Sequence, residues 1–118
     1  MTTITEDYVS FETAKLLKEK GFNEPCVYVY RHDGSEDIWD IDKEDIACQK
    51  PTLQMAMKWL REVHNIDIFP WKIGKGIYSC AIFNSNTGQD LSSDKDFPSE
   101  KYEETAEAAV KYWLENLI

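Results

Sequence analysis

The sequence predicts a single α+β domain with the element order αββαββα. Amphipathic helical segments open, centre and close the chain at residues 8–22, 51–64 and 102–117. Between them lie two pairs of short segments rich in β-branched and aromatic residues, and glycine occurs in the turn of each pair. The chain of 118 residues is long enough for one hydrophobic core without disulfides or metals. We therefore expect antiparallel β-hairpins covered by three amphipathic helices.

The first two helices have recognisable ends. Ser10 is a suitable N-cap for the first helix, and Gly21 can adopt the left-handed conformation that ends it. The second helix is expected to begin after Thr52 and to end at Asn65. Its helical periodicity predicts an inner face made of Leu53, Ala56, Met57, Leu60, Val63 and His64.

Two hairpins follow these helices. Residues 26–32 and 38–41 are predicted to pair across an Asp-Gly turn, because aspartate and glycine tolerate positive φ. Residues 66–69 and 77–83 are predicted to pair around the Gly-Lys-Gly sequence. Pro70 cannot donate a backbone hydrogen bond, so the first strand of this pair should be short, bulged or at a sheet edge.

The remaining segments are less regular. Residues 84–99 are rich in Asn, Ser, Asp and Gly, so we predict a mobile loop, and residues 1–7 are predicted to be a flexible N-terminus. Lys101 is a poor N-cap, so the third helix is expected to start earlier, at Ser99. Its inner face should contain Tyr102, Ala106, Ala109, Trp113 and Leu117.

The net charge of −9 disfavours direct binding of nucleic acid, because an acidic surface repels phosphates. The one segment that is not acidic spans residues 51–84, and nucleic acid would require its basic side chains to form one patch: Lys58, Arg61, Lys72 and Lys75. No apolar run is long enough to cross a membrane, and the N-terminus has no signal-peptide pattern. The sequence therefore predicts a cytoplasmic protein.

No motif predicts catalysis or a cofactor. An odd number of cysteines without a signal peptide indicates free thiols, here Cys26, Cys48 and Cys80. Neither histidine lies at a metal-ligand or thiol-catalysis spacing from them. Alternate carboxylates from Asp40 onward fail the calcium-loop pattern, and the Gly-Lys-Gly sequence lacks a phosphate-loop frame. We expect no metal, no cofactor and no enzymatic activity.

Two groups of residues are candidate interaction surfaces. Large aromatic side chains beside turns can anchor a protein interface, and the first candidate combines them with nearby lysines: Phe69, Trp71, Lys72 and Lys75. The second candidate is an acidic face within thirteen residues: Asp33, Glu36, Asp37, Asp40, Asp42, Glu44 and Asp45. An uncovered sheet edge near Pro70 would favour a homodimer over a monomer.

The three helical blocks also carry a resemblance. Their sequences, YVSFETAKLLKEKGF, PTLQMAMKWLREVH and YEETAEAAVKYWLENLI, resemble those of small proteins from phages and mobile elements of gut Bacteroidetes. The resemblance implies a small accessory protein and brings no activity with it. Our leading hypothesis is that the protein acts by binding another protein. The alternatives are an acidic mimic of nucleic acid that inhibits a host DNA- or RNA-binding protein, and an enzyme or small-ligand domain with a pocket between helices and sheet.

Overall fold

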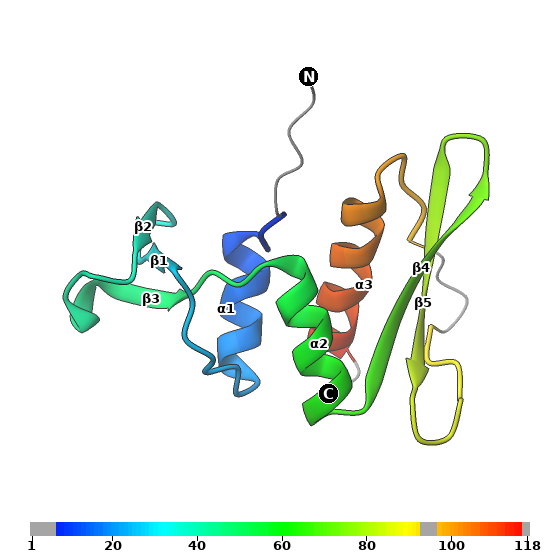
Figure 1. The fold of residues 1–118 in the computed structure, drawn as a ribbon, viewed down its shortest axis with the longest axis horizontal. Coiled ribbons are helices and arrows are strands. Elements are labelled where there is room, and N and C mark those ends of the chain that lie inside the picture. Colours follow the sequence, from blue (N-terminus) through cyan, green and yellow to red (C-terminus); the bar gives the residue numbers. More distant parts are fainter. Residues whose placement is uncertain (1–6, 93–96, 117–118) are drawn as a thin grey trace.

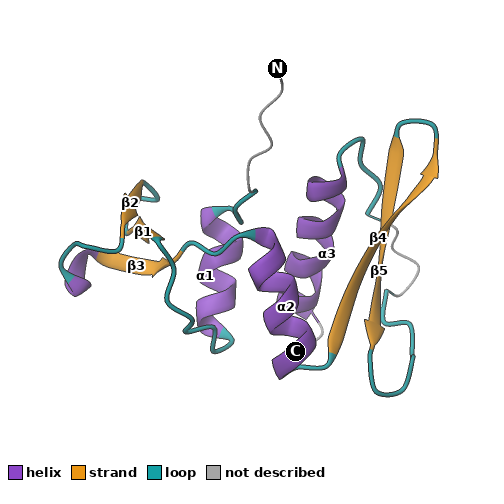
Figure 2. Ribbon diagram, in the orientation of Figure 1, coloured by secondary structure: helices purple, strands orange, loops and turns teal. Residues whose placement is uncertain are grey.

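The structure is a computed structural model that describes residues 7–92 and 97–116, and its elements form three layers (Figures 1 and 2). Helices α1 (Phe11–Glu19), α2 (Leu53–Val63) and α3 (Tyr102–Asn116) form the middle layer. A three-stranded sheet lies on one side of the helices and a two-stranded ribbon on the other, at opposite ends of the longest axis (Figure 1). The predicted α+β class is confirmed.

Helix α1 begins and ends as predicted. The Ser10 hydroxyl oxygen accepts a hydrogen bond from the backbone N–H of Thr13 at 3.3 Å, which satisfies one amide that the helix start leaves unpaired. After the helix, Gly21 has φ of +102°, and the backbone N–H of Phe22 donates to the carbonyl of Leu17 at 2.9 Å. This Schellman-type ending turns the chain back and buries Phe22 in the core.

The first sheet has three strands in the order β2-β1-β3, one more than the sequence predicts. Strands β1 (Tyr28–Arg31) and β2 (Glu36–Ile38) form the predicted hairpin, with Gly34 at φ +86° in its turn. Strand β3 (Ile46–Gln49) follows the short 3₁₀ helix η1 (Lys43–Asp45) and pairs antiparallel with the other edge of β1. No local turn signal marks this pairing, because its partner strand is distant in the chain. The observed order is therefore αβββαββα.

Helix α2 is capped as predicted but buries a different set of residues. The Thr52 side chain accepts from the backbone N–H of Met55 at 3.1 Å, and Asn65 takes φ of +58° after the helix. The prediction that Val63 is buried is wrong, because its side chain is 56% exposed. Val63 lies in the last turn and lines an open hollow with Pro25 and Glu62. The other predicted apolar positions are buried, and Trp59 joins them.

The second sheet is a two-stranded ribbon of β4 (Ile66–Gly74) and β5 (Ile77–Asn84), and both strands are longer than predicted. One side of the ribbon packs against α3. Ala106 and Ala109 are fully buried there, which allows the helix to approach the strands closely. The hydrophobic core therefore joins the helices to this inner side of the ribbon, and it extends on the other side to Tyr30 and Cys48 of the three-stranded sheet.

The segment 84–99 follows the outer edge of β5 where it is described. The backbone N–H of Leu91 donates to the carbonyl of Ile82 at 2.6 Å, and Ser99 exchanges backbone hydrogen bonds with Tyr78 at 2.7 and 3.0 Å. Residues 93–96 of this loop and residues 1–6 of the N-terminal segment lie outside the described residues. The mobility of the loop and of the N-terminus therefore stays a prediction.

Candidate interaction surfaces

The outer side of the β4–β5 ribbon carries a row of exposed apolar side chains. Because side chains alternate along a strand, Phe69 and Trp71 point to the same side of β4, and the exposed Ile73 follows them at a register irregularity between Lys72 and Gly74. Ile77 continues this row at the start of β5. The four side chains are between 38% and 56% exposed, and the rings of Phe69 and Trp71 lie 5.9 Å apart. We call these four residues the ribbon face.

The ribbon face is turned away from the hydrophobic core. Ile66 and Ile68 of β4 and Ile82 of β5 have the opposite orientation and belong to the core beside the helices. Across the ladder, Phe69 is paired with Ala81 and Trp71 with Ser79, both of which are small and buried. The two aromatic rings therefore stand above small neighbours and present most of the apolar surface on this side of the ribbon.

The structure divides the aromatic and basic patch that the sequence predicts. Phe69 and Trp71 share one side of β4, whereas Lys72 points to the other side and Lys75 lies in the turn. Ile73 and Ile77 complete the apolar row but were not among the predicted residues. The alternation of large apolar residues from Phe69 onward is the signal that identifies them.

The free edge of β4 is poorly suited to strand addition. On β5, Tyr78 makes both of its outward backbone hydrogen bonds with Ser99, so its N–H and C=O point away from β4. In an antiparallel ladder, the backbone groups of every second residue point away from the partner strand. The backbone groups of Cys80 therefore also point away from β4, and those of Pro70, its ladder partner, point to the edge of β4 that does not face β5. Pro70 therefore costs no bond within the ribbon and removes one donor from the edge, where another strand would need it.

A groove lies beside the three-stranded sheet, at the other end of the molecule. Its volume is about 700 Å³, and the ring of Trp39 on its wall is 63% exposed. The backbone N–H of Trp39 donates to the carbonyl of Val27 at 2.9 Å, which holds the two wall segments together. The groove is lined mainly by apolar and neutral side chains: Asn23, Pro25, Cys26, Val27, Trp39, Ile41, Ile46 and Gln49, together with Asp40 and Lys43.

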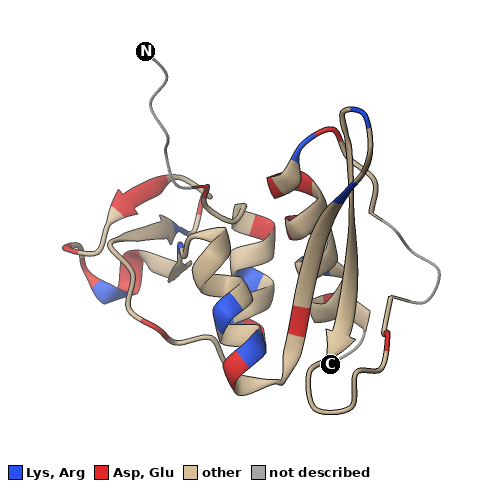
Figure 3. Ribbon diagram, turned by 45° about the vertical axis from the view of Figure 1, so that its right-hand side comes forward, with Lys and Arg blue, Asp and Glu red and all other residues tan. Residues whose placement is uncertain are grey.

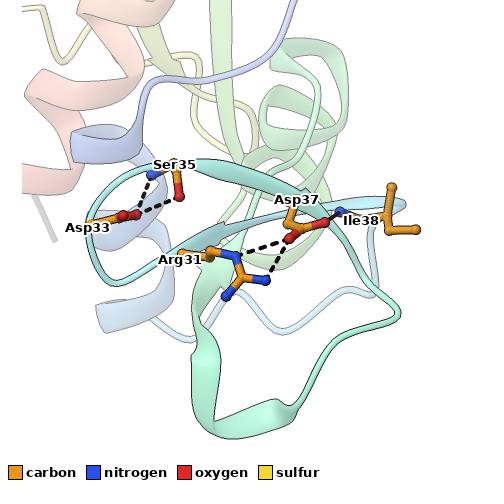
Figure 4. Close-up of polar contacts among 5 residues, drawn as sticks. All are labelled: Arg31, Asp33, Ser35, Asp37 and Ile38. Carbon is orange, nitrogen blue, oxygen red and sulfur yellow. Dashed lines mark hydrogen bonds and ion pairs between the residues drawn. The ribbon is translucent and has the colours of Figure 1, made fainter.

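Three carboxylates of the predicted acidic face have local partners, and Figure 4 shows two of them, Asp33 and Asp37. Asp37 accepts two hydrogen bonds from the Arg31 guanidinium, at 2.7 and 3.0 Å, and this contact lowers the pKa of Asp37. Asp33 accepts from the hydroxyl and backbone N–H of Ser35, which lowers its pKa as well. Glu36 forms an ion pair with Lys50. These three residues support the hairpin and are less available to a partner.

The other four carboxylates surround η1 and are exposed. They are Asp40, Asp42, Glu44 and Asp45. Asp40 lies on the wall of the groove, and the remaining three follow within the next five residues. Figure 3 shows these acidic residues at the sheet end of the molecule and basic residues toward the tip of the ribbon. The groove is therefore mainly apolar, with Asp40 and Lys43 in its lining and further carboxylates in the adjoining η1 segment.

Cys26 is the one thiol in the groove wall. Burial, followed by the nearby charge of Glu24, raises the pKa of Cys26 to about 11. The thiol therefore stays protonated at neutral pH, and a protonated thiol is a weak nucleophile. Its sulfur lies 4.0 Å from that of Met55, a contact that belongs to packing.

His64 is held between two indole rings. Its ring centroid lies 4.8 Å from that of Trp59 and 5.0 Å from that of Trp113, and burial lowers its pKa. His64 therefore stays neutral in the folded protein at a pH at which it is already protonated in the unfolded chain. As the pH falls through about 6.5, the unfolded chain binds more protons than the folded protein, so the free energy of unfolding should decrease. Urea denaturation at pH 7.5, 6.5 and 5.5 measures this loss, with the values chosen to bracket a normal histidine pKa of about 6.5.

The control for this measurement is His64→Gln, which removes the titrating group and keeps a polar side chain. The variant should lose the part of the pH dependence that His64 causes, while all other titrating groups are common to both proteins. Equal pH dependence in the two proteins would show that His64 titrates alike in the folded and unfolded chains.

Neither metal-ligand geometry nor similarity to known proteins assigns a function to this chain. Within residues 7–92 and 97–116, no three His, Cys, Asp or Glu side chains are placed to hold a metal ion. None of the helices in these ranges combines the length and apolar character needed to cross a membrane. The chain matches no protein-family model, no curated protein and no solved structure. The resemblance to phage and mobile-element proteins stays a prediction.

Proposed function

We propose that this protein is a small, non-enzymatic accessory protein that binds another protein through the ribbon face. The observation that carries the proposal is the row of Phe69, Trp71, Ile73 and Ile77, which is exposed on the side of the ribbon opposite the core. Soluble proteins seldom expose contiguous large apolar side chains unless a partner covers them. Burial of these side chains would supply the main driving force for binding.

Trp71 is the expected anchor of this surface. Tryptophan is among the residues that most often dominate binding energy, because its large rigid ring buries much apolar area at a small entropic cost. The ring of Trp71 already lies against Phe69 and opposite the small Ser79 side chain. It therefore has neighbours that hold it in place without covering it.

The observations favour this function over the two alternatives. A nucleic-acid mimic depends on a free array of carboxylates, but three of the seven candidates are bound to Arg31, Ser35 and Lys50. A catalytic groove depends on an activated group, whereas Cys26 has a raised pKa and is protonated at neutral pH.

Affinity capture from a lysate of the natural host tests the proposal. The wild-type protein, Trp71→Ala and Val63→Ala would each be immobilised, and bound proteins would be quantified by mass spectrometry. Val63 is a suitable control because it is equally apolar and 56% exposed, but lies on α2. We expect a stoichiometric partner on the wild type and on Val63→Ala, with recovery reduced at least about tenfold on Trp71→Ala.

Two outcomes would contradict the proposal. One is a partner whose recovery is unchanged by Trp71→Ala, which would place binding elsewhere on the molecule. The other is an empty capture with all three proteins. Circular dichroism of each variant would establish that a lost partner does not reflect a lost fold.

A further inference from the structure

The β4–β5 ribbon and the three-stranded sheet lie at opposite ends of the longest axis of the molecule (Figure 1), and strand β3 and the segments that flank β1 and β2 line the groove. The ribbon flanks α3 on one side of the helices, and the groove wall belongs to the three-stranded sheet and its connections on the other. The two surfaces cannot meet within one chain, because the helical layer separates them. They can meet only between two molecules.

The shapes of the two surfaces are complementary. The ribbon is a narrow two-stranded hairpin whose turn extends past the end of α3 (Figure 1), and its apolar row stands on one side. The groove has a volume of about 700 Å³, and its lining includes the exposed Val27 and Trp39 and the half-buried Ile41. A projecting row of large apolar side chains and an apolar groove each lose exposed surface when they combine. Trp71 and Trp39 would supply the aromatic anchors of such a contact.

The charges of the two surfaces are also complementary. Residues 68–83 contain Lys72 and Lys75 and no acidic residue, although the chain as a whole has a net charge of −9. Asp40 and Lys43 line the groove, and the exposed carboxylates of Asp42, Glu44 and Asp45 lie in the adjoining η1 segment. Docking would bring Lys75 of the ribbon turn toward these carboxylates, whereas contact between two ribbon faces would join two surfaces that both lack carboxylates.

Strand addition at β4 is a weaker route to self-association. Pro70 faces the free edge of β4 and has no N–H to donate, so a second strand would lose a ladder bond in the middle of the contact. The apolar side of the ribbon, and not its edge, is therefore the surface available to a second copy.

We propose that the ribbon face of one molecule binds the groove of a second copy, so that the protein assembles head to tail. This inference rests on the proposed function, because it takes the ribbon face as a binding surface and names its partner. A head-to-tail contact uses two different surfaces of each molecule. An open assembly of any size therefore still has one free ribbon face and one free groove. The products are rings or open chains, whose size increases with protein concentration.

Sedimentation velocity of the purified protein over a range of concentrations tests this inference. We expect species larger than a dimer at high concentration, and smaller species at high salt because the charge contacts are screened. Trp71→Ala and Trp39→Ala should each weaken self-association at least about tenfold, since each removes one anchor. Val63→Ala should assemble like the wild type.

A mixture of the two tryptophan variants distinguishes a head-to-tail contact from a symmetric one. Trp71→Ala keeps an intact groove, and Trp39→Ala keeps an intact ribbon face. Mixed in equal amounts, the two variants should form a dimer with one molecule of each and no larger species. A symmetric ribbon-to-ribbon dimer would instead be lost in Trp71→Ala and unchanged in Trp39→Ala, and that result would overturn the inference.

Charge reversal at the exposed Lys75 provides a second variant that does not disturb packing. Lys75→Glu should weaken assembly and reduce its dependence on salt, and an unchanged assembly would count against docking of the ribbon in the groove. A wild-type protein that stays monomeric at all concentrations would also overturn the inference. If it still captured a host protein through Trp71, the proposed function would stand without self-assembly.

Discussion

Trp59→Ala is expected to lower the free energy of unfolding by about 3–5 kcal/mol. The indole is buried between the ring of Phe22, 5.4 Å away, and the ring of His64, 4.8 Å away. Trp113 of α3 lies against the other side of His64. Removal of the Trp59 ring would open a cavity between the end of α1, α2 and α3. Urea denaturation followed by circular dichroism at neutral pH measures the loss.

The same chain offers a matched control in Trp39→Ala. The Trp39 side chain is 63% exposed on the wall of the groove, so little buried surface is lost with it. We expect the free energy of unfolding to change by no more than about 0.5 kcal/mol. A loss at Trp39 as large as that at Trp59 would mean that the groove is packed more tightly than its open shape indicates.

Leu60→Ala is expected to cost about 2–5 kcal/mol of unfolding free energy. Leu60 is fully buried on α2 and belongs to the core shared by the helices and the ribbon. The side chain has no route to solvent, so the surrounding residues can fill the vacated space only in part. Thermal and urea denaturation, compared at equal protein concentration, would measure the effect.

Val63→Ala on the same helix is the control for this second measurement. Its side chain is 56% exposed, and alanine has a higher helix propensity than valine, so we expect a change within about 0.5 kcal/mol of zero. If Val63→Ala destabilised the protein as strongly as Leu60→Ala, the Val63 side chain would have to be buried in solution. Self-association through the last turn of α2 would bury it, and the sedimentation experiment detects self-association.

The contrast between the four tryptophans matters for function. Trp59 and Trp113 are buried beside His64, whereas Trp39 and Trp71 are exposed at opposite ends of the molecule. Stability variants and binding variants can therefore be made with the same substitution at different sites. Loss of binding without loss of stability would identify the exposed pair as interaction residues.

Local signals in the sequence were sufficient for the ends of the first two helices and for one hairpin turn. Ser10 and Thr52 cap α1 and α2 through their own hydroxyl groups, and Gly21 and Asn65 end these helices at positive φ. Each of these features depends on a residue and its near neighbours in the chain, so it can be recognised without knowledge of the fold. The hairpin turn that contains Gly34 was predictable for the same reason.

The candidate site was predictable in part. Phe69 and Trp71 were predicted as candidate anchors beside a turn; both are exposed, but they lie within strand β4. Lys72 was grouped with them because it is adjacent in sequence, although adjacent residues in a strand point to opposite sides. The groove could not be predicted, because its wall combines the segments before β1, after β2 and within β3.

The amino-acid sequence alone determined the α+β class, the helix caps and the first hairpin turn, because short-range hydrogen bonds and side-chain periodicity specify them. Tertiary structure decided that β3 joins β1, that Trp59 is buried while Val63 is exposed, and that the ribbon face and groove lie at opposite ends. These outcomes depend on which surfaces meet after residues distant in the chain come together. Burial is a property of that packing, and no single segment of the chain carries it.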